Sequence, residues 1–126
     1  MAVPLRLRVP DVDDADFVAE MRNGQLVLAG SADHAAQIGF RELLERLDAE
    51  LRGRGVASVV VDMYGLDRMV AACFRELVAW VGRLQQLPAE ERYQIRVRGN
   101  PAIEWQRNGL RALACFDTEI VVVEGA

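Results

Sequence analysis

Six residues in the middle of the chain, Val56–Val61, form a nearly continuous apolar run that ends at Asp62. A run of this length suits a strand, and its lack of polar alternation is typical of a central strand that is covered on both faces. We therefore expect a strand over Val56–Asp62. The segments before and after it have helical periodicity. A buried strand between two helices predicts an α/β domain with a mostly parallel sheet.

Three amphipathic helices are expected. The first runs from Ala35 to about Arg52, with Ser31 or Asp33 as its N-cap and with Gly53 and Gly55 at its end. Its core stripe is formed by Phe40, Leu43, Leu44, Leu47 and Leu51. The second spans about 70–87, and its inner face is formed by Phe74, Leu77, Val78, Val81 and Leu84. The third starts at Pro101 with Asn100 as its cap and ends near Cys115, with a core stripe of Ile103, Leu110 and Leu113.

Further strands are predicted on either side of these helices. Asn23-Gly24 between Phe17–Arg22 and Gln25–Ala29 is a strong hairpin signal, because both central residues of a type I′ turn need a positive φ. Tyr93–Arg98 alternates in polarity, and Glu119–Val123 closes the chain. Near the N-terminus, Leu5–Val9 is an edge strand or an ordered tail. The acidic segment Asp11–Asp16 is interpreted as a solvated linker, so residues 1–126 form one domain.

Composition limits the classes of function. The net charge of −4 disfavours nucleic-acid binding, which depends on neutralising phosphates. The apolar runs are too short to span a membrane, and no secretory signal is visible. The two cysteines, Cys73 and Cys115, have no spacing that suits a disulfide framework or a zinc site. We expect a cytoplasmic protein with reduced thiols, no metal and no cofactor.

The segment 59–74 resembles the signature of STAS domains, the fold of anti-sigma-factor antagonists. That signature is a strand ending in Asp, a loop with a hydrophobic residue and Gly, then Asp-Ser-Ser or Asp-Ser-Thr and a helix. Asp62, Gly65 and Leu66 match the first part. Val70, Ala71 and Ala72 stand where the motif has Asp, the phosphoacceptor serine and its hydroxyl neighbour. The resemblance implies a mixed sheet with an N-terminal hairpin and with helices mainly on one side.

The resemblance also implies a function. In such domains the helix N-terminus receives the phosphate that a kinase adds, and the added charge changes partner binding. Alanine cannot accept a phosphoryl group, so a module that binds without this switch is expected. The partner would be a GHKL-type serine kinase or a PP2C-type phosphatase in bacterial signalling. The expected partner-binding residues are Tyr64, Gly65, Arg68, Met69, Val70, Ala71, Ala72 and Arg75.

Alternatives remain open at this point. The chain could instead be a self-associating assembly subunit, with Trp80, Trp105 and Arg107 as interface anchors outside the core stripes. An enzyme is not expected, because no Gly-rich phosphate loop, nucleophile elbow or HExxH motif is present. Cys73 is interpreted as a structural thiol and His34 as a surface residue. A more remote possibility is a small-molecule site at the carboxyl ends of the parallel strands, near Asp62–Met69 and Gly99–Pro101.

Overall fold

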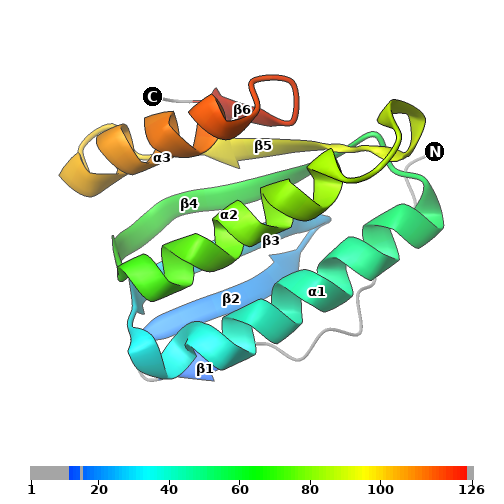
Figure 1. The fold of residues 1–126 in the computed structure, drawn as a ribbon. Helices are drawn as coiled ribbons and strands as arrows, with labels where there is room; N and C mark the ends of the chain where they lie inside the picture. Colours follow the sequence, from blue (N-terminus) through cyan, green and yellow to red (C-terminus); the bar gives the residue numbers. More distant parts are fainter. Residues whose placement is uncertain (1–11, 15, 125–126) are drawn as a thin grey trace.

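The computed structural model describes residues 12–14 and 16–124, which form a six-stranded sheet and three α-helices (Figure 1). The strands are β1 (Val12–Asp14), β2 (Phe17–Arg22), β3 (Gln25–Ala32), β4 (Ser58–Met69), β5 (Gln94–Arg98) and β6 (Val121–Glu124). The helices are α1 (Gln37–Arg54), α2 (Ala71–Gln85) and α3 (Glu104–Phe116), and short 3₁₀ turns cover His34–Ala36 and Ala89–Glu91. The expected alternation of strands and helices is confirmed, and the chain is an α/β domain.

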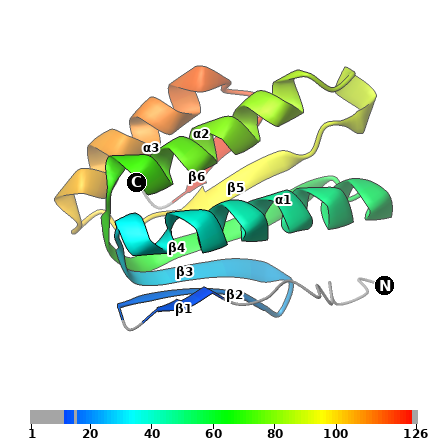
Figure 2. The same ribbon diagram turned by 60° about the horizontal axis from the view of Figure 1, so that its bottom comes forward.

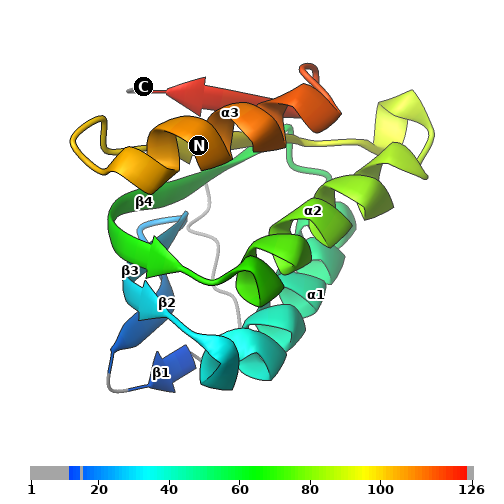
Figure 3. The same cartoon turned by 60° about the vertical axis from the view of Figure 1, so that its left-hand side comes forward.

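The strands lie in the sheet in the order of the sequence, from β1 to β6. The first two pairs are antiparallel and the remaining three are parallel. All three helices cover the same face of this sheet (Figures 2 and 3). The prediction of a mixed, mostly parallel sheet is therefore confirmed. The expected placement of the helices mainly on one side is confirmed as well. The expectation that the strand 56–62 is covered on both faces is not met, because Val60 is only half-buried between the buried Val59 and Val61.

The N-terminal part of the sheet is a hairpin extended by one strand. Asn23 and Gly24 have φ angles of 50° and 78° and join Arg22 directly to Gln25, as the sequence predicts. β1 then pairs with β2. The interpretation of 11–16 as a solvated linker is thus wrong for Val12–Asp14, which form an edge strand. The strand expected at 5–9 lies outside the described residues.

Gly30 allows a close approach at the start of this hairpin. Its φ is 87°, and a Cβ atom placed on it would lie 2.0 Å from the carbonyl oxygen of Asp16. The next residue, Ser31, donates its backbone N–H to that same oxygen. The pairing of β3 with β4 shifts register between Gly30 and Ser31. No residue with a side chain fits here without moving β2 or β3.

α1 carries the apolar stripe that its sequence predicts. Phe40, Leu43, Leu44, Leu47 and Leu51 are all buried. Asp33 rather than Ser31 caps the helical segment, because its side chain accepts a hydrogen bond from the N–H of Ala35 at 3.0 Å. Gly55 ends α1 in the left-handed conformation, whereas Gly53 lies inside the helix.

The buried face of α2 is rotated by about one residue from the predicted stripe. Cys73, Glu76, Leu77, Trp80, Val81 and Leu84 are buried, while Phe74 and Val78 are only partly buried. Because α2 lies between α1 and α3 (Figures 1 and 3), it buries more of its circumference than a helix at the edge of the layer. The prediction of Trp80 as an interface anchor is wrong, since Trp80 is 1% exposed.

Buried polar groups connect α1, α2 and the start of β5. The indole Nε1 of Trp80 donates to the hydroxyl oxygen of Tyr93 at 2.6 Å, and that hydroxyl donates to Oδ1 of Asp48 at 2.6 Å. Arg52 and Arg83 approach the other oxygen of Asp48, at 3.4 Å and 3.9 Å. Burial and the hydrogen bond to Asp48 raise the pKa of Tyr93 above its ordinary value. The indole N–H of Trp80, the hydroxyl of Tyr93 and Oδ1 of Asp48 therefore satisfy one another by hydrogen bonds.

Candidate protein-binding surface

β4 is longer than its sequence suggests, and its second half leads directly into α2. The pattern predicted a strand to Asp62 followed by a loop, but the strand continues to Met69. On one edge it follows β3 as far as the pair Ala32–Met69. On the other edge β5 ends at Arg98, opposite Asp62. The carbonyl groups of residues 63–67 on this second edge therefore need partners from elsewhere.

Side chains around the start of α3 supply those partners. Nε2 of Gln106 donates to the carbonyl oxygens of Met63 at 2.7 Å and Leu66 at 2.9 Å. Nδ2 of Asn100 donates to the carbonyl of Tyr64 at 3.2 Å. The indole Nε1 of Trp105 donates to the carbonyl of Asp67 at 2.7 Å. These three side chains hold residues 63–67 in an extended course and so fix the position at which α2 begins.

The prediction that α3 starts at Pro101 is wrong, because the residues before the helix form a turn that Asn100 and Gln106 hold. Pro101 and Ala102 form a turn, in which Oδ1 of Asn100 accepts from the N–H of Ala102 at 3.0 Å, and the helix begins only at Glu104. Oε1 of Gln106 accepts from the N–H of Asn100 at 2.8 Å. Gln106 is 1% exposed, and sequence reasoning missed its role.

α2 begins at Ala71 without a polar side chain as its cap. Val70 is the N-cap in an extended conformation, and its N–H donates to the carbonyl of Ala32 at 2.9 Å. Ala71 is exposed and Ala72 is half-buried. The first turn of α2 thus presents a small apolar side chain where a serine would present its hydroxyl.

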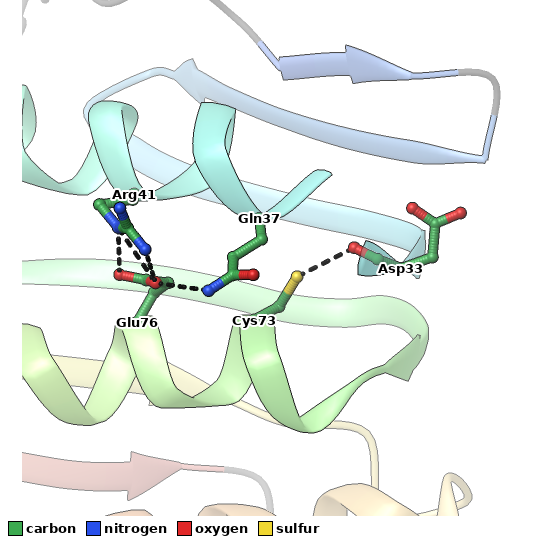
Figure 4. Close-up of polar contacts among 5 residues, drawn as sticks. All are labelled: Asp33, Gln37, Arg41, Cys73 and Glu76. Carbon is green, nitrogen blue, oxygen red and sulfur yellow. Dashed lines mark hydrogen bonds and ion pairs between the residues drawn. The ribbon is translucent and has the colours of Figure 1, made fainter. Parts of the chain in front are cut away.

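A buried carboxylate fixes α2 against α1 one turn further on (Figure 4). The carboxylate of Glu76 accepts hydrogen bonds from the guanidinium of Arg41 at 3.2 Å and from Nε2 of Gln37 at 3.1 Å. Burial opposes ionisation of this carboxyl. The hydrogen bonds from Arg41 and Gln37 and the charge of Arg41 nevertheless lower the pKa of Glu76.

Cys73 lies beside this ion pair on the buried side of α2. Its Sγ donates to the carbonyl oxygen of Asp33 at 3.2 Å, as Figure 4 shows. Burial raises the pKa of the Cys73 thiol, and the charges of Asp33 and Glu76 raise it further. A protonated, covered thiol is not a nucleophile. The geometry agrees with the interpretation of Cys73 as structural.

The contacts of Glu76 bring the first turns of α1 and α2 together. Between Gln37 and Arg41 lies Ile38, which is 65% exposed and which the sequence did not single out. On α2, Ala71 and Arg75 are exposed, and on the strand before it Arg68 is exposed as well. Ile38, Arg68, Ala71 and Arg75 are called here the two-helix surface.

The predicted partner-binding residues do not form one compact patch. Tyr64 and Gly65 are exposed near the carboxyl end of β5, six and five residues before Val70. A strand rises about 3.3 Å per residue, so Tyr64 and Val70 are on the order of 15–20 Å apart. Met69 and Val70 are half-buried and pack against the core.

The remaining predicted anchors lie on α3. Trp105 is half-buried, packs against the core and uses its indole N–H within the molecule, so it is peripheral core rather than a free anchor. Arg107 is exposed, and its guanidinium donates to the carbonyl of Pro101 at 3.3 Å. The described residues contain no group of three or more His, Cys, Asp or Glu side chains able to hold a metal ion.

Comparisons with known proteins add no family assignment. Neither the scan against protein-family models nor the search of curated proteins finds a match for this chain. Across residues 12–14 and 16–124, no helix is both long and apolar enough to cross a membrane. The case for a function therefore depends on the geometry of the chain itself.

Proposed function

We propose that this protein is a non-enzymatic protein-binding module whose partner contacts the two-helix surface. The observation that carries the proposal is the exposure of two apolar side chains at the starts of the helices that Glu76 joins, Ala71 of α2 and Ile38 of α1. Exposed apolar side chains of this size often mark contact sites when they gather at one place.

The surface is built rigidly, which suits recognition. Glu76 ties α2 to α1 through Arg41 and Gln37, and Gln106 ties the strand before α2 to α3. A surface held in place from both sides loses little conformational entropy when a partner binds. The start of α2 is thus fixed relative to the first turn of α1.

Binding at this surface would not be switched by phosphorylation of residue 71. The STAS-like segment that the sequence suggests carries alanine there, and Ala72 beside it lacks a hydroxyl as well. The partner classes that this resemblance implies are a GHKL-type serine kinase and a PP2C-type phosphatase, both in a signalling pathway. Regulation would then depend on the abundance of the two proteins.

The test compares four forms of the full chain as bait in lysate of the source organism, with captured proteins identified by mass spectrometry. The forms are the native chain, Ala71→Glu, Ile38→Asp and the control Ala79→Glu. Ala79 is also exposed, but it lies two turns further along α2. A partner should be retained by the native and control baits and lost from the other two, because each introduces an unpaired charge into the contact.

Equal capture by all four baits would place the contact elsewhere and overturn the proposal. The second candidate is self-association, which the exposed Phe116 at the end of α3 favours, since this side chain is 52% exposed. Light scattering of the purified chain separates the two. An oligomer that dissociates with Phe116→Ser but not with Ile38→Asp would support assembly.

A further inference from the structure

A groove lies at the edge of the sheet where the parallel strands β4, β5 and β6 end. It measures about 400 Å³ and is lined by Asp62, Tyr64, Arg98, Gly99 and Glu124. Asp62 is in register with Arg98, and Arg98 is in register with Glu124. Val61 and Val97, the residues before Asp62 and Arg98, are buried under the helices. By the alternation of strands, the charged side chains point to the face without helices.

The charged side chains of the groove, Asp62, Arg98 and Glu124, do not neutralise one another. Oε1 of Glu124 accepts a hydrogen bond from Nε of Arg96 at 2.6 Å, so this carboxylate has a cation of its own. The carboxylate of Asp62 accepts one hydrogen bond from the described residues, at Oδ1 from the backbone N–H of Tyr64 at 2.9 Å. The guanidinium of Arg98 makes no hydrogen bond or ion pair with any residue in 12–14 or 16–124. The carboxylate of Asp62 and the guanidinium of Arg98 therefore lie on neighbouring strands, and neither has an ion-pair partner in the part of the chain that the structure describes.

The wall of the groove is held in place. Tyr64 is 62% exposed, and its ring is the largest apolar surface beside the two charges. Its carbonyl accepts from Nδ2 of Asn100 at 3.2 Å, and its N–H is used by Asp62. On the other side, the N–H of Gly99 donates to the carbonyl of Glu124 at 3.0 Å. The backbone around the groove is thus fixed on both sides.

We propose that this groove binds a small zwitterion that carries an ammonium group and a carboxylate on one carbon atom, as a free α-amino acid does. Asp62 would accept the ammonium group and Arg98 would bind the carboxylate through its planar fork. Neighbouring strands lie only about 4.8 Å apart, so the two charges of the ligand must be close together. Tyr64 would contact the remainder of the ligand.

The same charges argue against simpler ligands. A phosphate or another multiply charged anion would be repelled by Asp62 and Glu124. A cation without an acidic group would be repelled by Arg98. The competing arrangement is a direct ion pair between Arg98 and Asp62, which would close the groove to any ligand. This inference does not depend on the proposed partner surface, because none of the four residues of that surface lines the groove.

The test is a titration of the ¹⁵N-labelled full chain, followed by the amide signals of Asp62, Tyr64 and Gly99. Glycine and L-phenylalanine are the probes, and acetate and methylammonium at equal ionic strength are the half-ligand controls. We expect saturable shifts with both amino acids at a Kd on the order of 1 mM, which two charge-assisted contacts would supply. Each half-ligand should bind at least ~10-fold more weakly.

Matched variants complete the experiment. Arg98→Gln and Asp62→Asn should each weaken binding of glycine by ~10-fold or more, whereas Arg111→Gln, at an exposed position of α3, should leave it unchanged. Three results would overturn the inference. These are the absence of saturable shifts with either amino acid, equal shifts with acetate, and unaltered affinity in the Arg98→Gln chain.

Discussion

Replacement of Tyr93 by Phe should destabilise the protein far more than the same replacement at Tyr64. The hydroxyl of Tyr93 accepts from Trp80 and donates to Asp48, both at 2.6 Å, and all three residues are at most 3% exposed. Without the hydroxyl, the buried indole N–H loses its acceptor and Oδ1 of Asp48 loses its donor. A buried polar group without a partner costs about 1–3 kcal/mol, so we expect a loss of ~2–4 kcal/mol.

Tyr64 provides the matched control, because its side chain is 62% exposed and its contacts within the protein are through the backbone. Tyr64→Phe should change the free energy of unfolding by less than ~0.5 kcal/mol. Urea denaturation followed by tryptophan fluorescence measures both values. Equal effects of the two replacements would refute the reasoning, and so would a loss below ~1 kcal/mol at Tyr93.

The same hydroxyl makes a prediction about alkaline pH. The pKa of Tyr93 is raised in the folded state, so its contribution to stability is complete below the unfolded pKa of about 10 and declines as the pH rises above it. Because the unfolded chain releases this proton and the folded chain keeps it, the free energy of unfolding should fall by ~1 kcal/mol between pH 10 and 11. The chain contains no lysine, so few other groups titrate in this window. The free energies of unfolding of the native chain and of Tyr93→Phe, plotted against pH, should therefore converge over this range. A constant difference between them would contradict the raised pKa of Tyr93.

Two further predictions concern the backbone and the acid range. Gly30→Ala should destabilise the fold by ~2 kcal/mol or more, because the added Cβ would meet the carbonyl of Asp16. Gly53→Ala, inside α1, should instead stabilise the fold by ~0.5–1 kcal/mol. Thermal unfolding measures both variants, and similar melting temperatures would exclude the close approach at Gly30. The pKa of Glu76 is lowered by Arg41, so its stabilising effect is present above the unfolded pKa of about 4.3 and is lost as the pH falls through the folded value. The native chain should therefore lose more stability below about pH 4 than Glu76→Gln, and identical acid profiles would show that this ion pair is not linked to folding.

Much of the fold follows from local patterns. The hairpin at Asn23-Gly24 and the apolar stripe of α1 were predictable because backbone conformation and burial there depend on residues close in the chain. The order of elements followed from the change of period between helix and strand. These features need no knowledge of which segments meet.

The errors lie where distant segments supply each other's partners. The second half of β4 has no strand pattern of its own, since Tyr64-Gly65 is typical of a loop; its carbonyls are paired by Gln106, about 40 residues later. Trp80 can be buried because the hydroxyl of Tyr93 accepts a hydrogen bond from its indole N–H. Ile38 is outside the apolar stripe of α1 and lies exposed on its polar face, at helical spacing from Glu42 and Glu45. None of these contacts leaves a local signal.

The dependence of β4 on α3 has a consequence for synthesis of the chain. During translation, residues 58–69 leave the ribosome long before Gln106, which must supply hydrogen bonds to the carbonyls of Met63 and Leu66. Until then, that edge of the strand has only water as a partner. The start of α2 can take its final place only after most of the polypeptide has been made, and a nascent chain cut before residue 106 exposes an unpaired strand edge to its neighbours.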